Sequence, residues 1–158
     1  MGKKMPALEV TLSEVLANRY SANLTRIREL ASRLTEQEFW TKPFPYGNSF
    51  GHLVLHLAGN LNYYIGAQIA DTGYVRNRER EFSESNPPAK PDALKQLDLA
   101  VSVAAETIRG QSPADWGRAY SAAGTHCGNR LDITVQCAAH MQHHIGQMIY
   151  LVYELGRH

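Results

Sequence analysis

The sequence lacks any long apolar run and any marked excess of charge. No stretch nears the ~18 consecutive apolar residues that a membrane span requires, and the basic N-terminal residues 1–6 have no apolar run behind them. The formal net charge is +1, and the 16 basic residues are spread along the chain without forming a tract. These absences argue against a membrane span and against nucleic acid as a partner. A cytoplasmic location is the resulting prediction.

Cysteine is also scarce. Cys127 and Cys137 are too far apart in the sequence for a CxxC pair, and one bridge would not make a disulfide framework. The chain has 158 residues, of which 44% are hydrophobic and 20% charged, and a chain of this length can bury a core without such bridges. We therefore expect reduced cysteines and a single globular domain over residues 1–158.

Apolar residues recur at spacings of three and four in four long segments, which indicates amphipathic helices. The expected ranges are 11–34, 49–71, 92–109 and 132–155. A capping box formed by Thr35 and Glu38 predicts a short helical turn through Trp40. Ser112-Pro113 predicts the start of another, because proline suits the first helical position. Asp132 is expected to cap the last helix.

The segments between these helices carry proline, glycine or dense charge. Residues 42–47 contain two prolines and cannot remain helical. Residues 74–90 are rich in arginine, glutamate and proline and show no periodicity, which predicts a long exposed crossover. Residues 117–130 are rich in glycine and alanine and predict a turn or short hairpin. The expected fold is all-α, a four-helix bundle with a long crossover between helices two and three.

Histidine is the unusual residue of this sequence. Four of the seven histidines fall into two pairs spaced i,i+4: His52 with His56, and His140 with His144. The second pair projects into the apolar face of the last helix. Burying imidazoles without partners costs about 1–3 kcal/mol for each unsatisfied group. Since residues one turn apart lie about 5–6 Å from each other, a divalent metal ion bridging the pair would meet this need.

A metal site of catalytic type takes a third ligand from another element and leaves a position open for water or substrate. His56 lies closer to the apolar stripe of its helix than His52, so His56 is the predicted third ligand. His52 is expected to face solvent or to support the site from outside. Asn60 and Gln147 could orient a ligand, and Asp98 is a weaker candidate for such support.

The histidine segments resemble those of the DinB/YfiT-like metal-dependent superfamily. Residues 48–60 read NSFGHLVLHLAGN, and residues 140–147 read HMQHHIGQ. In that superfamily a histidine followed by an apolar residue and alanine joins an HxxxH pair on the last long helix, and these match His56, His140 and His144. The resemblance implies a four-helix bundle whose three histidines bind zinc or nickel, and a homodimer.

Characterised members of this superfamily include bacillithiol S-transferases and mycothiol-dependent isomerases. The resemblance therefore implies a metal that lowers the pKa of a low-molecular-weight thiol, and a small-molecule substrate. Our leading hypothesis is a metal-dependent thiol S-transferase. The alternatives are a metal-dependent hydrolase, a non-catalytic metal-binding or stress-response module, and a helical interaction protein whose histidines hydrogen-bond within the core. Three ligands favour an enzyme slightly, because structural zinc sites are usually closed by four.

Overall fold

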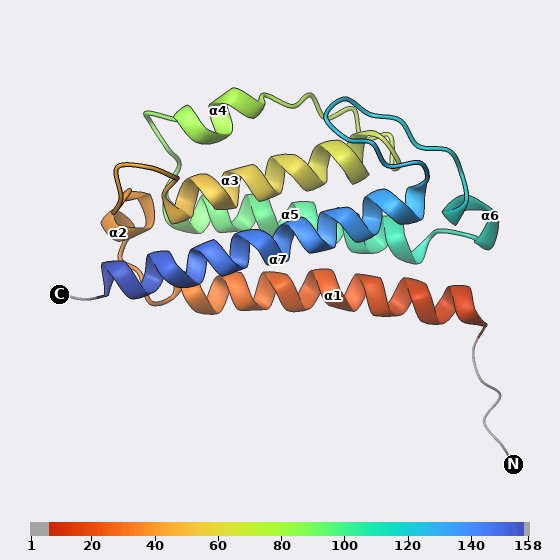
Figure 1. Cartoon of the computed structure of the whole chain (residues 1–158), viewed down its shortest axis with the longest axis horizontal. Coiled ribbons are helices and arrows are strands. Elements are labelled where there is room, and N and C mark those ends of the chain that lie inside the picture. The colour runs from red at the N-terminus through yellow and green to blue at the C-terminus, as the bar shows by residue number, and fades with distance from the viewer. Residues whose placement is uncertain (1–6, 157–158) are drawn as a thin grey trace, which may run out of the picture.

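The computed structural model describes residues 7–156, and this part of the chain is helical without any β-strand. Figure 1 shows the long helices of this part side by side, with the shorter helices at the ends and along one face. The elements are α1 (Leu8–Ala31), α2 (Glu36–Trp40), α3 (Phe50–Leu61), the π-helical turn η1 (Asn62–Ala67), α4 (Arg78–Ser83), α5 (Lys90–Arg109), α6 (Pro113–Trp116) and α7 (Arg130–Leu155). The predicted all-α bundle is confirmed.

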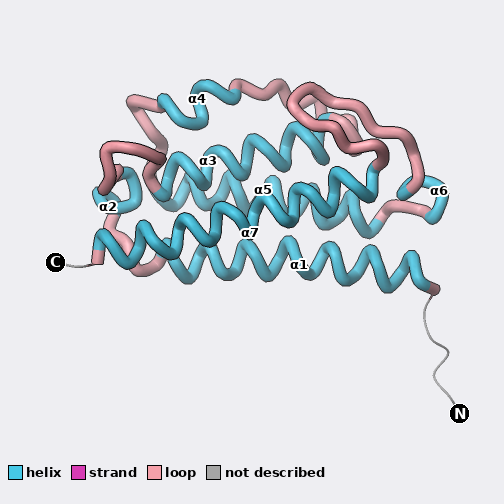
Figure 2. Tube along the Cα trace, viewed as in Figure 1, coloured by secondary structure: helices cyan, strands magenta, loops and turns pink. Residues whose placement is uncertain are grey.

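The four long helices form a bundle in which α1 and α3 each pack against both α5 and α7. In Figure 1, α1 and α7 run in one direction, and α3 and α5 run in the other. Because α3 and α5 are parallel neighbours, the chain must travel back along the bundle before α5 can begin. Figure 2 shows this return as two loops on either side of α4, which lies along α3. No helix among residues 7–156 is long and apolar enough to cross a membrane.

Side-chain caps fix several of the helix starts. The hydroxyl of Thr35 accepts the backbone N–H of Glu38 at 3.2 Å, and the Glu38 carboxylate accepts the Thr35 N–H at 2.7 Å, so the predicted capping box is confirmed. At α7 the predicted cap, Asp132, was wrong, because the observed cap lies three residues earlier. The cap is Asn129, whose side chain accepts the backbone N–H of Asp132 at 2.9 Å, and the helix therefore starts at Arg130.

The core lies between the inward faces of the four long helices. Tyr20 is one buried residue that is bonded across the bundle: its hydroxyl on α1 donates to the backbone carbonyl of Thr134 on α7 at 2.6 Å. Such a bond fixes the axial position of one helix against the other. The largest fully buried side chains are Tyr20, Phe39, Phe50, Ile27, Leu30, Leu57, Leu61, Ile65, Leu97, Ile108, Ile133 and Met141.

The crossover is the main departure from the expected fold. Residues 74–90 were expected to be exposed and irregular, yet they contain the two-turn helix α4. The Asn77 side chain caps this helix by accepting the backbone N–H of Arg80 at 3.1 Å. Glu81, on the face of α4 that meets α3, is 7% exposed. The segment was misread because a single buried residue in a six-residue helix leaves no periodic pattern.

Two further segments border the site. Helix α3 passes into the π-helical turn η1, a feature that often accompanies functional sites and that the sequence did not predict. Gly73 follows at a φ of 74°, a left-handed conformation that glycine adopts readily. Residues 117–129 form a loop whose ends are joined by a backbone hydrogen bond of 3.0 Å from Arg130 to Arg118.

Candidate metal site

The three histidines singled out by their spacing meet inside the bundle. His56 on α3 lies opposite His140 and His144 on α7. The Nε2 atom of His140 is 3.2 Å from Nε2 of His56 and 3.0 Å from Nε2 of His144. Ligand atoms around a tetrahedral zinc ion at about 2.1 Å lie about 3.4 Å apart. These two separations are close to that value, and the ligand atoms of all three histidines lie within 4.8 Å of one another, so the cluster could hold one ion.

A carboxylate from the crossover holds His56. Oε2 of Glu81 lies 2.9 Å from Nδ1 of His56, and both side chains are buried. An ionised carboxylate only accepts hydrogen bonds, so Nδ1 of His56 carries the hydrogen and Nε2 presents its lone pair to the cluster. Nη2 of Arg76 is 3.4 Å from the same nitrogen. Arg76 and His56 both bind Glu81, and we attribute the 3.4 Å separation between them to this common partner.

Arg76 keeps Glu81 ionised. Its guanidinium donates two hydrogen bonds to the Glu81 carboxylate, Nε to Oε1 at 2.7 Å and Nη2 to Oε2 at 2.9 Å. Burial alone would raise the pKa of Glu81, but the bonds from His56 and Arg76 hold this pKa below its ordinary value. The Glu81 carboxylate is therefore charged at neutral pH.

His144 is held in the same tautomer by a neighbour on its own helix. Oε1 of Gln147 accepts a hydrogen bond from Nδ1 of His144 at 2.7 Å, which leaves Nε2 of His144 facing the cluster as an acceptor. Burial is the main cause that lowers the pKa of His144 to about 4 and that of His140 to about 3. Both rings are neutral at pH 7, which is the form that binds metal.

Without a metal ion, the tautomers of His56 and His144 leave ring nitrogens of the cluster without hydrogen-bond partners. Both rings direct a lone pair at Nε2 of His140, which can donate at most one hydrogen to one of them. If the His140 hydrogen is on Nδ1 instead, three lone pairs converge, and Nδ1 itself is buried with no partner among the described residues. A cation at the centre would satisfy all three Nε2 atoms together. This arrangement of ring nitrogens therefore fits a divalent metal site better than it fits a core in which the histidines only bond to one another.

A glycine on α3 makes room for the carboxylate. A Cβ atom added at Gly59 would lie 2.1 Å from Oε1 of Glu81, far inside contact distance. Residue 59 lies three positions after His56, so the missing side chain leaves a socket on the helix surface beside the histidine. Glu81 can occupy this socket only because residue 59 is glycine.

The structure corrects two expectations about surrounding residues. His52 does not face solvent: it is 8% exposed, its Nδ1 lies 2.6 Å from the Ser49 hydroxyl, and its ring packs edge-on against Trp40. Asp98 does not support the site, because it is paired with Arg28 of α1. The predicted contact of Gln147 with a histidine ring is present.

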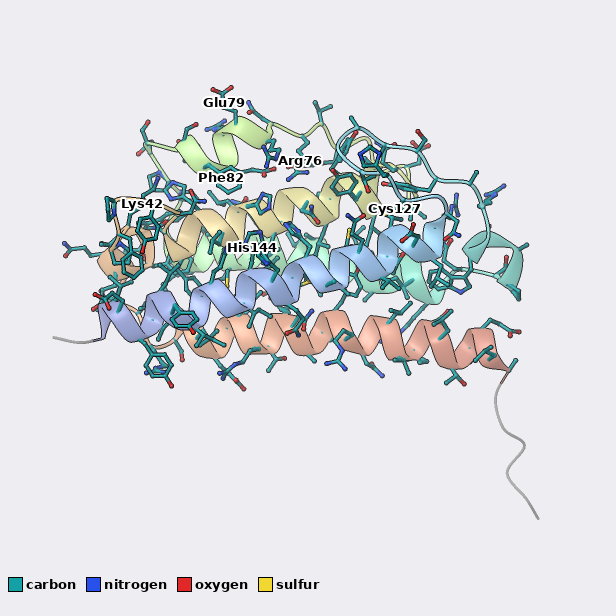
Figure 3. The ribbon with its side chains drawn as sticks, viewed as in Figure 1. Lys42, Arg76, Glu79, Phe82, Cys127 and His144 are labelled. Atoms are coloured by element: carbon teal, nitrogen blue, oxygen red, sulfur yellow. The ribbon has the colours of Figure 1, made fainter. Side chains whose placement is uncertain are left out.

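Glu81 and Arg76 are the site residues that sequence reasoning missed. Figure 3 shows Arg76 and Phe82 between the crossover and α3, whereas Glu79 points away from the bundle. The Phe82 ring lies 4.7 Å from the His56 ring, centroid to centroid. The available signal was Phe82, an aromatic residue within a charged segment, because such a side chain indicates that one face of the segment is covered.

A cavity of about 260 Å³ adjoins the histidine cluster. It lies between α3, α7, the start of the crossover and the loop that precedes α7. His56 and His140 form part of its wall, so a small molecule in the cavity could reach the centre of the cluster. Its lining residues are His56, Asn60, Tyr64, Arg76, Arg78, Gly124, Thr125, Ile133, Gln136, Cys137 and His140.

An all-α bundle with three converging histidines and a cavity beside them defines a class of helical protein that could bind one metal ion. The DinB superfamily model matches residues 19–148, a span that includes all three histidines. The chain belongs to the DinB superfamily. No curated protein matches the chain.

The roles of the two histidines on α3 can be separated by substitution. We predict that His56→Ala removes most of the bound metal, because it deletes one of three converging ring nitrogens. His52→Ala should retain most of it, since the His52 ring is bonded to Ser49 and to the backbone of Glu84 instead. Elemental analysis of the folded variants measures this. Equal loss in both would mean that the third ligand is wrongly assigned.

The Gly59 socket provides a second prediction. We expect Gly59→Ala to displace Glu81 from His56 and to weaken metal binding by about 10–100-fold, the usual cost of losing the partner of a ligating histidine. Glu81→Ala should have a similar effect. Gly146→Ala is the matched control, because this helical glycine on α7 has open space where its Cβ would go. Competition titration with a chelator measures the affinities, and unchanged affinity in Gly59→Ala would refute the positioning role of Glu81.

Proposed function

We propose that this protein is a metal-dependent enzyme that activates a low-molecular-weight thiol. In this proposal His56, His140 and His144 hold one divalent ion, zinc or nickel, which supplies the positive charge that favours a thiolate over a thiol. The carrying observation is that the cluster offers three nitrogen ligands and borders a cavity. A site with three protein ligands leaves a coordination position for a substrate, whereas structural zinc sites are usually closed by four.

The chain's own residues would prepare this site before any substrate arrives. Glu81 and Gln147 fix the tautomers of His56 and His144, so that both Nε2 atoms face inward. Ile133 and Cys137 give the cavity an apolar wall beside the histidines. Burial raises the pKa of the Cys137 thiol to about 12, so Cys137 remains protonated and does not compete with a thiol substrate.

Hydrolysis is the second candidate reaction, and the cavity favours it less. Metal hydrolases commonly place a carboxylate beside the attacking water as a general base. No aspartate or glutamate lines this cavity among the described residues. Glu81, the nearest ionised carboxylate, is already bound to His56 and Arg76. A thiol needs no such base beyond solvent, because its own pKa of about 8.5 lies close to neutral pH.

Cobalt substitution tests the proposal. We expect a small thiol to produce a sulfur-to-cobalt charge-transfer band that acetate does not produce, and His144→Ala to abolish it. Binding should strengthen as pH rises toward the pKa of the free thiol, about 8.5 for a cysteine-like group, because the deprotonated form coordinates. His126→Ala, in the loop before α7, is the control that should keep the band.

The opposite outcome is equally clear. If bacillithiol, mycothiol, glutathione and simpler thiols all leave the cobalt spectrum unchanged while cobalt stays bound, the thiol proposal is wrong. A hydrolytic or a non-catalytic function would then be the leading hypothesis.

A further inference from the structure

The cavity beside the histidines has an unusual charge distribution. Two arginines line it, Arg76 and Arg78, and no acidic residue does so among the described part of the chain. The charge of Arg76 is balanced by its paired hydrogen bonds to Glu81. Arg78 forms no ion pair in the described structure, and its guanidinium lies 5.6 Å from the centre of the Phe82 ring. One arginine at this cavity is therefore available to an incoming anion.

A metal ion at the three histidines would add to this positive character. Histidine binds a metal ion as a neutral imidazole. Neutral ligands do not cancel the charge of a divalent ion, so a metal-loaded cluster would make the cavity more positive still. This step rests on the metal site of the proposed function, whereas the arginine does not.

The size and remaining polar groups of the cavity narrow the ligand further. A volume of about 260 Å³ is below the usual range of drug-sized pockets, about 300–1,000 Å³. Asn60 is 6% exposed, and its side-chain oxygen has no hydrogen-bond donor among the described residues. A matching ligand is therefore small and carries an anionic group, and a hydrogen-bond donor on it could meet Asn60.

The loop before α7 gives the cavity a fixed side. The Tyr64 hydroxyl donates to the backbone carbonyl of Ala123 at 3.1 Å, which ties this loop to η1. The hydroxyl of Thr125 donates to Oε1 of Gln136 at 2.8 Å, which ties the same loop to α7. With two of its sides held in place, the cavity has a defined shape, and a single molecule that reaches both Arg78 and the histidines within its volume is of limited length.

We propose that this cavity binds a small organic carboxylate, with the carboxylate at Arg78 and the thiol of the same molecule at the histidine cluster. Arg78 is then a specificity-determining residue: it selects for the charge of the substrate without contacting the sulfur. A guanidinium suits this role because its planar donors match a carboxylate.

Matched thiols test the selection on the cobalt-loaded protein. The probes are 3-mercaptopropionate, 2-mercaptoethanol and cysteamine, which end in a carboxylate, a hydroxyl and an ammonium group. Each is titrated into the wild type and Arg78→Gln, and only the ratio of affinities for each thiol is compared, so that differences in thiol pKa cancel. We expect Arg78→Gln to weaken 3-mercaptopropionate about tenfold, as for loss of a charged hydrogen bond. The affinity for 2-mercaptoethanol should stay within about twofold.

Two more variants separate a specific contact from a general effect of charge. Arg78→Lys keeps the charge and should retain part of the preference for 3-mercaptopropionate. Arg80→Gln removes an arginine from the same short helix, but Arg80 pairs with Glu84 and does not line this cavity. It should leave all three affinities unchanged. If Arg78→Gln alters the three thiols equally, or alters none, the carboxylate site is refuted.

A probe without sulfur separates this inference from the thiol proposal. Saturation-transfer NMR on the zinc-loaded protein compares propionate with its uncharged amide, propionamide. We expect transfer to propionate, loss of that transfer in Arg78→Gln, and none to propionamide. If no thiol gives a cobalt band but propionate binds through Arg78, thiol activation is wrong and the carboxylate contact holds. If neither probe depends on Arg78, the inference is overturned.

Discussion

The approach of three imidazole Nε2 atoms to one another inside the bundle is the constraint on which the site depends. Hydrogen bonds from His56 to Glu81 and from His144 to Gln147 settle which nitrogen of each ring carries the hydrogen. Once those hydrogens are fixed, the facing nitrogens can only accept, and one hydrogen from His140 cannot satisfy both of them. The hydrogen bonds outside the cluster therefore leave ring nitrogens inside it that a cation would satisfy.

The topology of the bundle provides one of those outside contacts. Since α3 and α5 run parallel, the chain must return along the bundle between them, and this return places α4 against α3 beside His56. Glu81 on α4 enters the socket at Gly59 with its charge balanced by Arg76. The crossover is therefore both the connection that the fold requires and the support for one histidine.

Periodicity and spacing predict the four long helices, because each buries an apolar stripe that repeats in the sequence. They also indicate His56, His140 and His144, since histidines within such a stripe need polar partners. The same reasoning cannot place Glu81, whose burial depends on a contact with a helix 25 positions earlier at His56. It also misplaced Asp98, because a helix face alone does not tell which neighbour it meets.

The distribution of charge supports our proposal of a reactive metal ion over a structural one. Structural zinc sites commonly use thiolates, whose negative charge offsets that of the ion. Here all three ligands are imidazole nitrogens, which carry no negative charge, and the one nearby carboxylate lies behind His56, where Arg76 balances it. On the cavity side the lining is positive or neutral, with Arg78 and no acidic group among the described residues. An ion held in this way would keep most of its positive charge. That charge would act on any group that entered from the cavity.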